Sequence, residues 1–76
     1  MKIKEYLFFN DMTVKKLAEI AGINQQTMSL LKNGVNNPSF RMATRIVNAT
    51  QGIVSYQDLL PDVYQAIVNE YKKKQG

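Results

Sequence analysis

The chain contains no cysteine and no histidine. Without cysteine it can form neither a disulfide nor a thiolate zinc site. Without histidine it lacks the commonest general base and metal ligand of proteins. Asp58 and Asp62 are four residues apart, but Pro61 lies between them, and no glycine-rich phosphate loop, nucleophile elbow or metal-ligand spacing is present. The sequence therefore predicts a protein that is not an enzyme and that needs no cofactor and no metal.

Long apolar segments are also absent. No run approaches the roughly 20 residues of a membrane span, and no signal-peptide pattern is present. We therefore expect a cytoplasmic protein without a membrane partner. Its 76 residues suffice for one domain, which at this size buries only about 60% of the surface of the unfolded chain. Ten Lys and Arg against six Asp and Glu give a formal net charge of +4, which favours an anionic partner.

Residues 13–34, TVKKLAEIAGINQQTMSLLKNG, have the pattern of two short helices joined by a tight turn. Thr13 is of the N-cap type, and apolar residues follow at helical spacing at Val14, Leu17, Ala18 and Ala21. Gly22 suits a left-handed helix end, and Asn24 is a second N-cap. The second helix is predicted over 25–32, ended by Asn33 and Gly34. So short a turn between two helices predicts a helix-turn-helix.

The second of these helices has an unusual polar face. Met28 and Leu31 are three residues apart and are predicted to pack inward, whereas the opposite face carries Gln25, Gln26, Ser29 and Lys32. A glutamine amide both donates and accepts, so it can bind adenine with two hydrogen bonds in the major groove. The alternative is a plain solvent-facing surface, because glutamine is a good helix former. The caps, the glycine and the turn favour DNA binding.

These residues resemble the Cro/C1-type helix-turn-helix family of phage and bacterial repressors. The matching pattern is T-x-x-x-L-A-x-x-A-G-I-N-Q-Q-T-M-x-x-L-x-N-G, followed by Asn37-Pro38-Ser39-Phe40. The resemblance spans Ile3 to Leu60, and residues 49–62 are also similar to the YdaS/Cro-like regulators of prophages. It implies an all-α fold, a compact five-helix bundle with an additional C-terminal helix. The domain is then 1–60, and 61–76 form the added helix.

The resemblance also implies a function. The chain would be a sequence-specific transcriptional regulator of phage or prophage repressor type that binds double-stranded DNA and is nucleoid-associated when bound. Helix 25–32 would enter the major groove, and its base-reading residues would be Gln25, Gln26, Ser29 and Leu30. Leu30 has two interpretations, as a contact to a thymine methyl group or as a core residue.

A second set of residues is predicted to bind phosphates of the DNA backbone: Thr13, Asn24, Lys32, Asn33, Asn36, Asn37, Ser39 and Arg41. For the asparagines and the serine, turn formation is an equally good explanation. Relatives often place a phosphate-binding glutamine where Val14 stands, and valine cannot make that bond. The backbone N–H groups at this helix start remain available to an anion. Lys2 and Lys4 either reach a phosphate or are simply solvated, and Arg45 is predicted to be a surface residue.

The segments around the motif are predicted to complete the core. Ile3, Tyr6 and Leu7 form the apolar stripe of a first helix, which Phe9 is expected to widen. Ser39 is predicted to cap a helix from Phe40 to about Thr50, whose apolar face starts at Phe40 and continues with Met42, Ala43, Ile46 and Val47. Ile53 and Val54 are expected to cross the core in extended form. Ser55 and Asp58 have the spacing of a capping box.

The last helix, predicted to begin at Pro61, carries a wide apolar stripe of Val63, Tyr64, Ile67, Val68 and Tyr71. Related repressors bind as dimers, and a dimer needs a self-complementary patch, so this stripe is the dimer candidate. The alternative is that the stripe covers the protein's own core. A different class of function is a protein-interaction module, such as an antitoxin-like protein whose last helix binds another protein.

Overall fold

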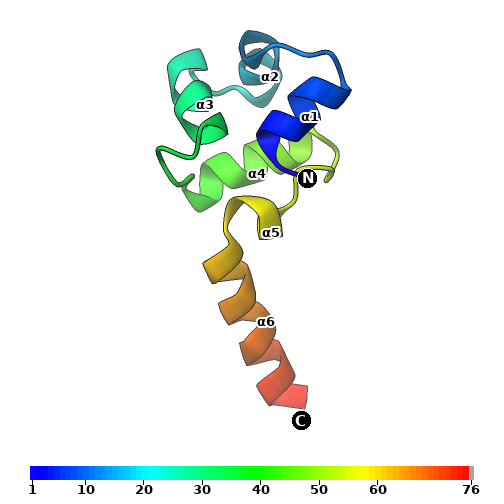
Figure 1. Cartoon of the computed structure of the whole chain (residues 1–76). Helices are drawn as coiled ribbons and strands as arrows, with labels where there is room; N and C mark the ends of the chain where they lie inside the picture. The colour runs from blue at the N-terminus through cyan, green and yellow to red at the C-terminus, as the bar shows by residue number, and fades with distance from the viewer. Residues whose placement is uncertain (76) are drawn as a thin grey trace.

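The structure, a computed structural model, describes residues 1–75, with side chains for residues 1–74. This part of the chain forms helices and no strand (Figure 1). The helices are α1 (Ile3–Phe9), α2 (Val14–Ala21), α3 (Gln25–Lys32), α4 (Phe40–Ala49), α5 (Tyr56–Leu59) and α6 (Pro61–Gln75). The predicted all-α class is therefore confirmed, and so are the predicted bounds of α3.

The first five helices surround one apolar core. Leu17, Met28, Ile46 and Val54 are fully buried in it, and they come from α2, α3, α4 and the α4–α5 connection. Helix α1 adds Ile3, Tyr6 and Leu7, as its predicted stripe requires. Because these residues are far apart in the sequence, the core joins the helix-turn-helix to the segments on both sides of it.

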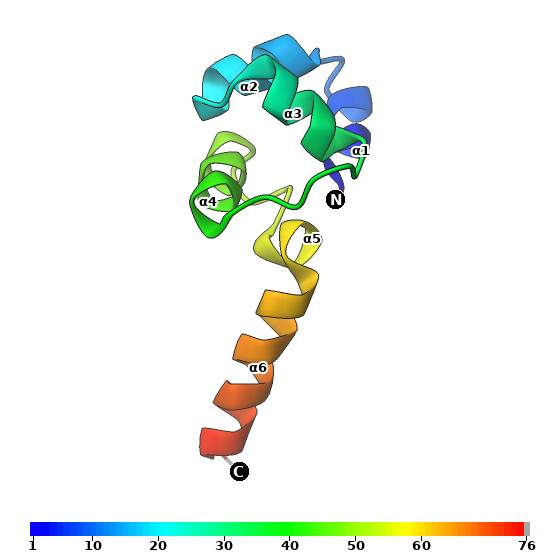
Figure 2. The same cartoon turned by 90° about the vertical axis from the view of Figure 1, so that its left-hand side faces the viewer.

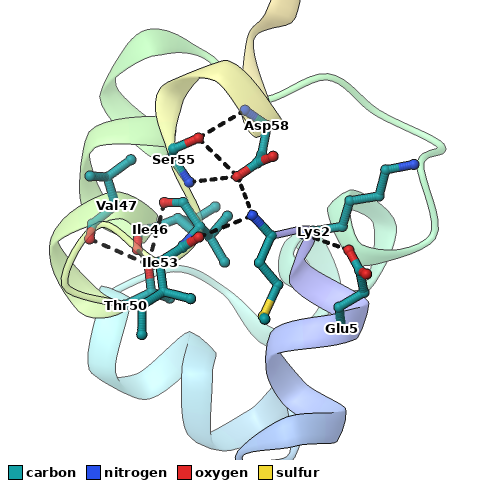
Figure 3. Close-up of polar contacts among 10 residues, drawn as sticks. Lys2, Glu5, Ile46, Val47, Thr50, Ile53, Ser55 and Asp58 are labelled. Carbon is teal, nitrogen blue, oxygen red and sulfur yellow. Dashed lines mark hydrogen bonds and ion pairs between the residues drawn. The ribbon is translucent and has the colours of Figure 1, made fainter.

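The predicted helix caps are confirmed. Thr13 Oγ1 accepts a hydrogen bond from Lys16 N at 3.1 Å, and Ser39 Oγ accepts one from Met42 N at 3.2 Å. Ser55 and Asp58 form the expected capping box at the start of α5 (Figure 3). Each cap gives a partner to a backbone N–H that the first turn of a helix leaves unpaired.

Three predicted core residues lie outside the core. Phe9 is 68% exposed, because two residues advance a helix by about 200° and carry Phe9 away from the Leu7 side. Ile53 is 47% exposed beside the fully buried Val54, and the predicted extended form is wrong, because both residues lie in bends and Ile53 N donates to Thr50 O at 3.1 Å in a turn. Phe40 is also exposed, and its ring stacks on Tyr56 with ring centroids 5.4 Å apart.

A buried hydroxyl group is hydrogen-bonded to the backbone on both sides of the turn that follows α4. Thr50 is 1% exposed, and among residues 1–74 it is the one buried polar residue. Its Oγ1 accepts a hydrogen bond from Val54 N at 3.1 Å and lies 2.9 Å from Ile46 O, to which it can donate (Figure 3). The sequence predicted Thr50 only as the approximate end of α4. In the structure its hydroxyl group is the hydrogen-bond partner of the Val54 backbone N–H, in the segment that follows α4.

Helix α6 projects away from the bundle (Figures 1 and 2). It follows α5 directly at Pro61 and packs against that helix. Of its predicted apolar stripe only Val68 is half-buried, whereas the other four residues are exposed: Val63, Tyr64, Ile67 and Tyr71. The alternative in which the stripe covers the protein's own core is therefore wrong for this structure, because α6 leaves the bundle instead of folding back over it.

Candidate nucleic-acid interface

The turn between α2 and α3 is set by a glycine. Gly22 has a φ of 70°, a left-handed conformation that costs glycine little. Ile23 N then donates to Ala18 O at 2.9 Å and closes the end of α2. The turn is also held from a distance, since Arg45 Nη1 of α4 donates to Gly22 O at 2.8 Å. The sequence predicted Arg45 only as a surface residue, and no local pattern identifies a partner so distant along the chain.

Helix α3 is anchored at its start and along its inner face. Asn24 Oδ1 accepts hydrogen bonds from Gln26 N at 2.8 Å and from Thr27 N at 3.4 Å. Met28 and Leu31 are buried, as predicted. Figure 2 shows α3 in front, with the chain running from its end across the same side of the molecule to α4. Cap and core together fix which side chains α3 presents to solvent.

The outer face of α3 carries polar groups that the protein itself does not use. Gln25 and Gln26 are exposed, and within the described residues no hydrogen bond involves their side-chain amides. Ser29 is half-buried beside them. Leu30 is 36% exposed and is not part of the core, which argues against its interpretation as a core residue. These four residues lie side by side on a fixed helix surface.

Several phosphate candidates gather beside α1. Lys32 is half-buried and lies towards α1, at the edge of the α3 surface. It shares a hollow of about 470 Å³ with Asn33, Asn36 and Asn37, and the same hollow is lined by Lys2 and Lys4. A second hollow, of about 450 Å³, joins Lys32 and Lys4 to Thr13. The structure thus brings five of the eight candidates together around Lys2, which precedes α1, and Lys4, which lies in its first turn.

The other three candidates are placed apart from these hollows. Asn24 and Ser39 cap α3 and α4, so their side-chain oxygens already accept backbone hydrogen bonds. Arg41 is exposed in the first turn of α4. Asn24 therefore lies at the start of α3. Ser39 and Arg41 lie at the start of α4.

The lysine and arginine side chains of residues 1–74 are not paired with carboxylates. In the part of the chain that the structure describes, no lysine or arginine side chain forms an ion pair, and the one ion pair joins the amino group of Met1 to Asp58. Desolvation raises the pKa of Asp58, but hydrogen bonds from that amino group and from Ser55 outweigh it, so the pKa of this carboxyl lies below its ordinary value. Lysine and arginine side chains without a carboxylate partner remain available to an anionic ligand.

Residues 2–60 match the Cro/C1-type HTH DNA-binding domain in a comparison with protein families. The chain belongs to the Cro/C1-type helix-turn-helix family. The matched residues include the whole helix-turn-helix and end just before Pro61, where α6 begins. A search of curated proteins found no match, and neither did a search of solved structures.

Membership of the Cro/C1-type family makes this a DNA-binding domain of the kind that regulators carry. In helix-turn-helix proteins the second helix of the motif contacts DNA, and in this chain that helix is α3. Within residues 1–75, no helix has the length and apolar character needed to span a membrane.

Proposed function

We propose that this Cro/C1-type protein is a sequence-specific transcriptional regulator of phage or prophage repressor type, which acts in the cytoplasm. Helix α3 enters the major groove of double-stranded DNA, and the protein acts as a homodimer on two half-sites. The observation that carries the proposal is the outer face of α3, where two exposed glutamine amides have no partner inside the described chain. Bound at an operator, such a protein represses by denying the site to other proteins.

Within that complex, base reading falls to Gln25, Gln26, Ser29 and Leu30. Gln26 lies on the side of α3 opposite Met28 and Leu31, which are buried, so its amide projects furthest towards a base edge. A glutamine amide matches the acceptor and donor of adenine, and the Leu30 side chain suits a thymine methyl group. The two lysine-lined hollows and Arg41 hold the phosphates on either side and fix the register of α3 in the groove.

The test is to select bound sites from random duplexes and then to measure affinity for the selected site and for random DNA. Gln26→Ala should weaken binding to the selected site by about 1–3 kcal/mol and binding to random DNA much less. Gln57→Ala makes the same chemical change on α5 and is the matched control. Equal losses on both kinds of DNA from Gln26→Ala would mean that α3 does not read bases.

Salt dependence tests the phosphate contacts separately. Lys32→Ala and Arg41→Ala should each lower the slope of log K against log salt by about one unit and weaken all sequences alike. Lys73→Ala removes the same charge from α6 and should leave the slope unchanged. If neither Lys32→Ala nor Arg41→Ala changed the slope, these two side chains would not be phosphate ligands.

The exposed apolar stripe of α6 supports a second candidate function, an antitoxin-like protein whose last helix binds another protein. The two candidates differ in their behaviour on immobilised DNA. A regulator is retained until salt or nuclease releases it, whereas a module that only binds protein is not retained.

A further inference from the structure

The end of α2 has no positive charge of its own. None of the residues in its last turn is basic, although the carbonyl groups at a helix end carry a partial negative charge that a nearby cation stabilises. Arg45 of α4 supplies that cation, since its Nη1 donates to Gly22 O at 2.8 Å. Gly22 has no side chain in the way of this contact, and a Cβ there would lie 3.4 Å from Nη1. The charged partner of this helix end therefore comes from another helix.

The bond between Arg45 and Gly22 is exclusive on both sides. Within residues 1–74, Gly22 O accepts no other hydrogen bond, and the Arg45 side chain forms no other hydrogen bond and no ion pair. Both residues are exposed, so water can take the place of the lost donor when Arg45 is truncated. Water does not replace the connection between α4 and the turn. The bond therefore matters more for the geometry of the turn than for the stability of the fold.

The turn that Arg45 contacts is the segment at which α3 begins. Residues 22–24 alone separate α2 from α3. Helix α3 packs against α2 and α1, whereas α4 packs against α2 and α5. Two of the bonds that shape the turn are local, because Ile23 N donates to Ala18 O and Asn24 caps α3. The hydrogen bond from Arg45 is the one that connects this turn to α4.

We propose that Arg45 is a positioning residue for DNA recognition, which fixes the start of α3 relative to α4. This inference rests on the proposed function, in which Gln25 and Gln26 at the start of α3 reach base edges. Helix α4 also carries Arg41, the proposed phosphate ligand, in its first turn. A recognition group has to be held within about 0.5 Å and about 10–20° of its productive geometry. Arg45 thus connects the base-reading amides to the helix that holds a phosphate.

A direct phosphate contact is the competing explanation for Arg45. This residue is four positions after Arg41 and therefore lies on the same side of α4. Its guanidinium, however, already donates a charge-assisted hydrogen bond to Gly22 O, which directs it at the turn. The two roles predict different salt dependence, because only a phosphate contact releases counterions from DNA.

Affinities for the selected site and for random DNA distinguish the two roles. Arg45→Met keeps the apolar stem without its donors. It should lower affinity for the selected site roughly tenfold and for random DNA by no more than about twofold, with an unchanged salt slope. Arg45→Lys keeps a donor and the charge and should restore most of the affinity, whereas Lys73→Met on α6 is the control and should change neither affinity. A lower salt slope for Arg45→Met, or equal losses on both kinds of DNA, would overturn the positioning role.

A double-mutant cycle with Gln26→Ala tests whether Arg45 acts through α3. In the Gln26→Ala background, Arg45→Met should cost about threefold at most on the selected site, because the Gln26 amide that it would misplace is gone. Arg41→Ala should cost the same factor in both backgrounds, since a phosphate contact does not depend on that amide. Equal losses from Arg45→Met in both backgrounds, measured well below the unfolding temperature, would show that Arg45 does not act through Gln26 and would overturn the inference.

Amide hydrogen exchange in the DNA-free protein separates this inference from the proposed function. Arg45→Met should speed exchange at Ile23 N and Gln26 N, whose bonds shape the turn, and Arg45→Lys should not. Faster exchange in a chain that selects no DNA site would contradict the function and support the role of Arg45 in fixing the turn. Unchanged exchange and unchanged affinity of Arg45→Met, in a chain that does select a site, would overturn the inference and leave the function standing.

Discussion

Helices α4 and α6 carry apolar residues at the same spacing and use them differently. In α4 the residues are Met42, Ala43, Ile46 and Val47, all buried or half-buried, and in α6 they are Val63, Tyr64, Ile67 and Val68, of which three are exposed. The corresponding isoleucines are the clearest contrast, since Ile46 is 0% exposed and Ile67 is 59% exposed. Spacing thus decides that a helix has an apolar face, and the path of the chain decides what covers it.

The largest expected effect comes from truncating these two isoleucines in turn. Ile46→Ala should lower the free energy of unfolding by about 2–5 kcal/mol, because it removes buried methyl groups and leaves a cavity. Ile67→Ala should change the stability of the monomer by no more than about 0.5 kcal/mol. Denaturant unfolding at several protein concentrations measures both. Equal losses in dilute monomer would mean that α6 folds back onto the bundle in solution.

Removing a hydrogen-bonding side chain should likewise cost more stability at the end of α4 than on α6. Thr50→Val keeps the shape of the buried side chain at the end of α4 but leaves Val54 N without its hydrogen-bond partner, which should cost about 1–3 kcal/mol. Asn69→Ala breaks the exposed bond from Gln65 Nε2 on α6, 3.0 Å long, and should cost less than about 0.5 kcal/mol. Chemical denaturation compares the two variants. A neutral Thr50→Val would show that water replaces the hydroxyl group.

The next prediction concerns the turn between α2 and α3, which lies within the bundle and positions α3. Gly22→Ala should cost about 1–2 kcal/mol for a left-handed alanine, and its Cβ would also lie 3.4 Å from Arg45 Nη1. Gly34→Ala has a similar φ of 74° with no atom within 4 Å of the new Cβ, so it isolates the backbone cost. Thermal unfolding and DNA affinity should be measured on both. A Gly22→Ala loss no larger than that of Gly34→Ala would mean that the Arg45 contact yields freely.

The smallest expected effect concerns pH at the junction of bundle and α6. Because the pKa of Asp58 is lowered in the folded state, its contribution to stability is present above the ordinary carboxyl pKa and is lost as the pH falls through the lower folded value. Asp58→Asn should therefore be less stable than the unmodified chain at neutral pH, and the gap should close in acid. Unfolding measured across this range in both proteins gives the gap, with Glu19→Gln as control. A gap independent of pH would remove the ionised carboxylate as its cause.

The sequence by itself determined the local features. Thr13, Asn24, Ser39 and Ser55 cap helices as predicted, because a capping side chain bonds a backbone only two or three residues away. The turn at Gly22 and the inward side of α3 were predictable for the same reason. The outer face of α3, which is the candidate site, follows from these two features by helical geometry alone.

The tertiary structure decided what depends on elements that are distant along the chain. The bond from Arg45 to Gly22 spans 23 residues, and the position of Lys32 beside Lys4 depends on how α1 packs against α3. The exposure of Phe9, Ile53 and the α6 stripe likewise depends on which other helices pack against them. The physical reason is that burial is a property of pairs of surfaces, whereas a sequence pattern describes only one of them.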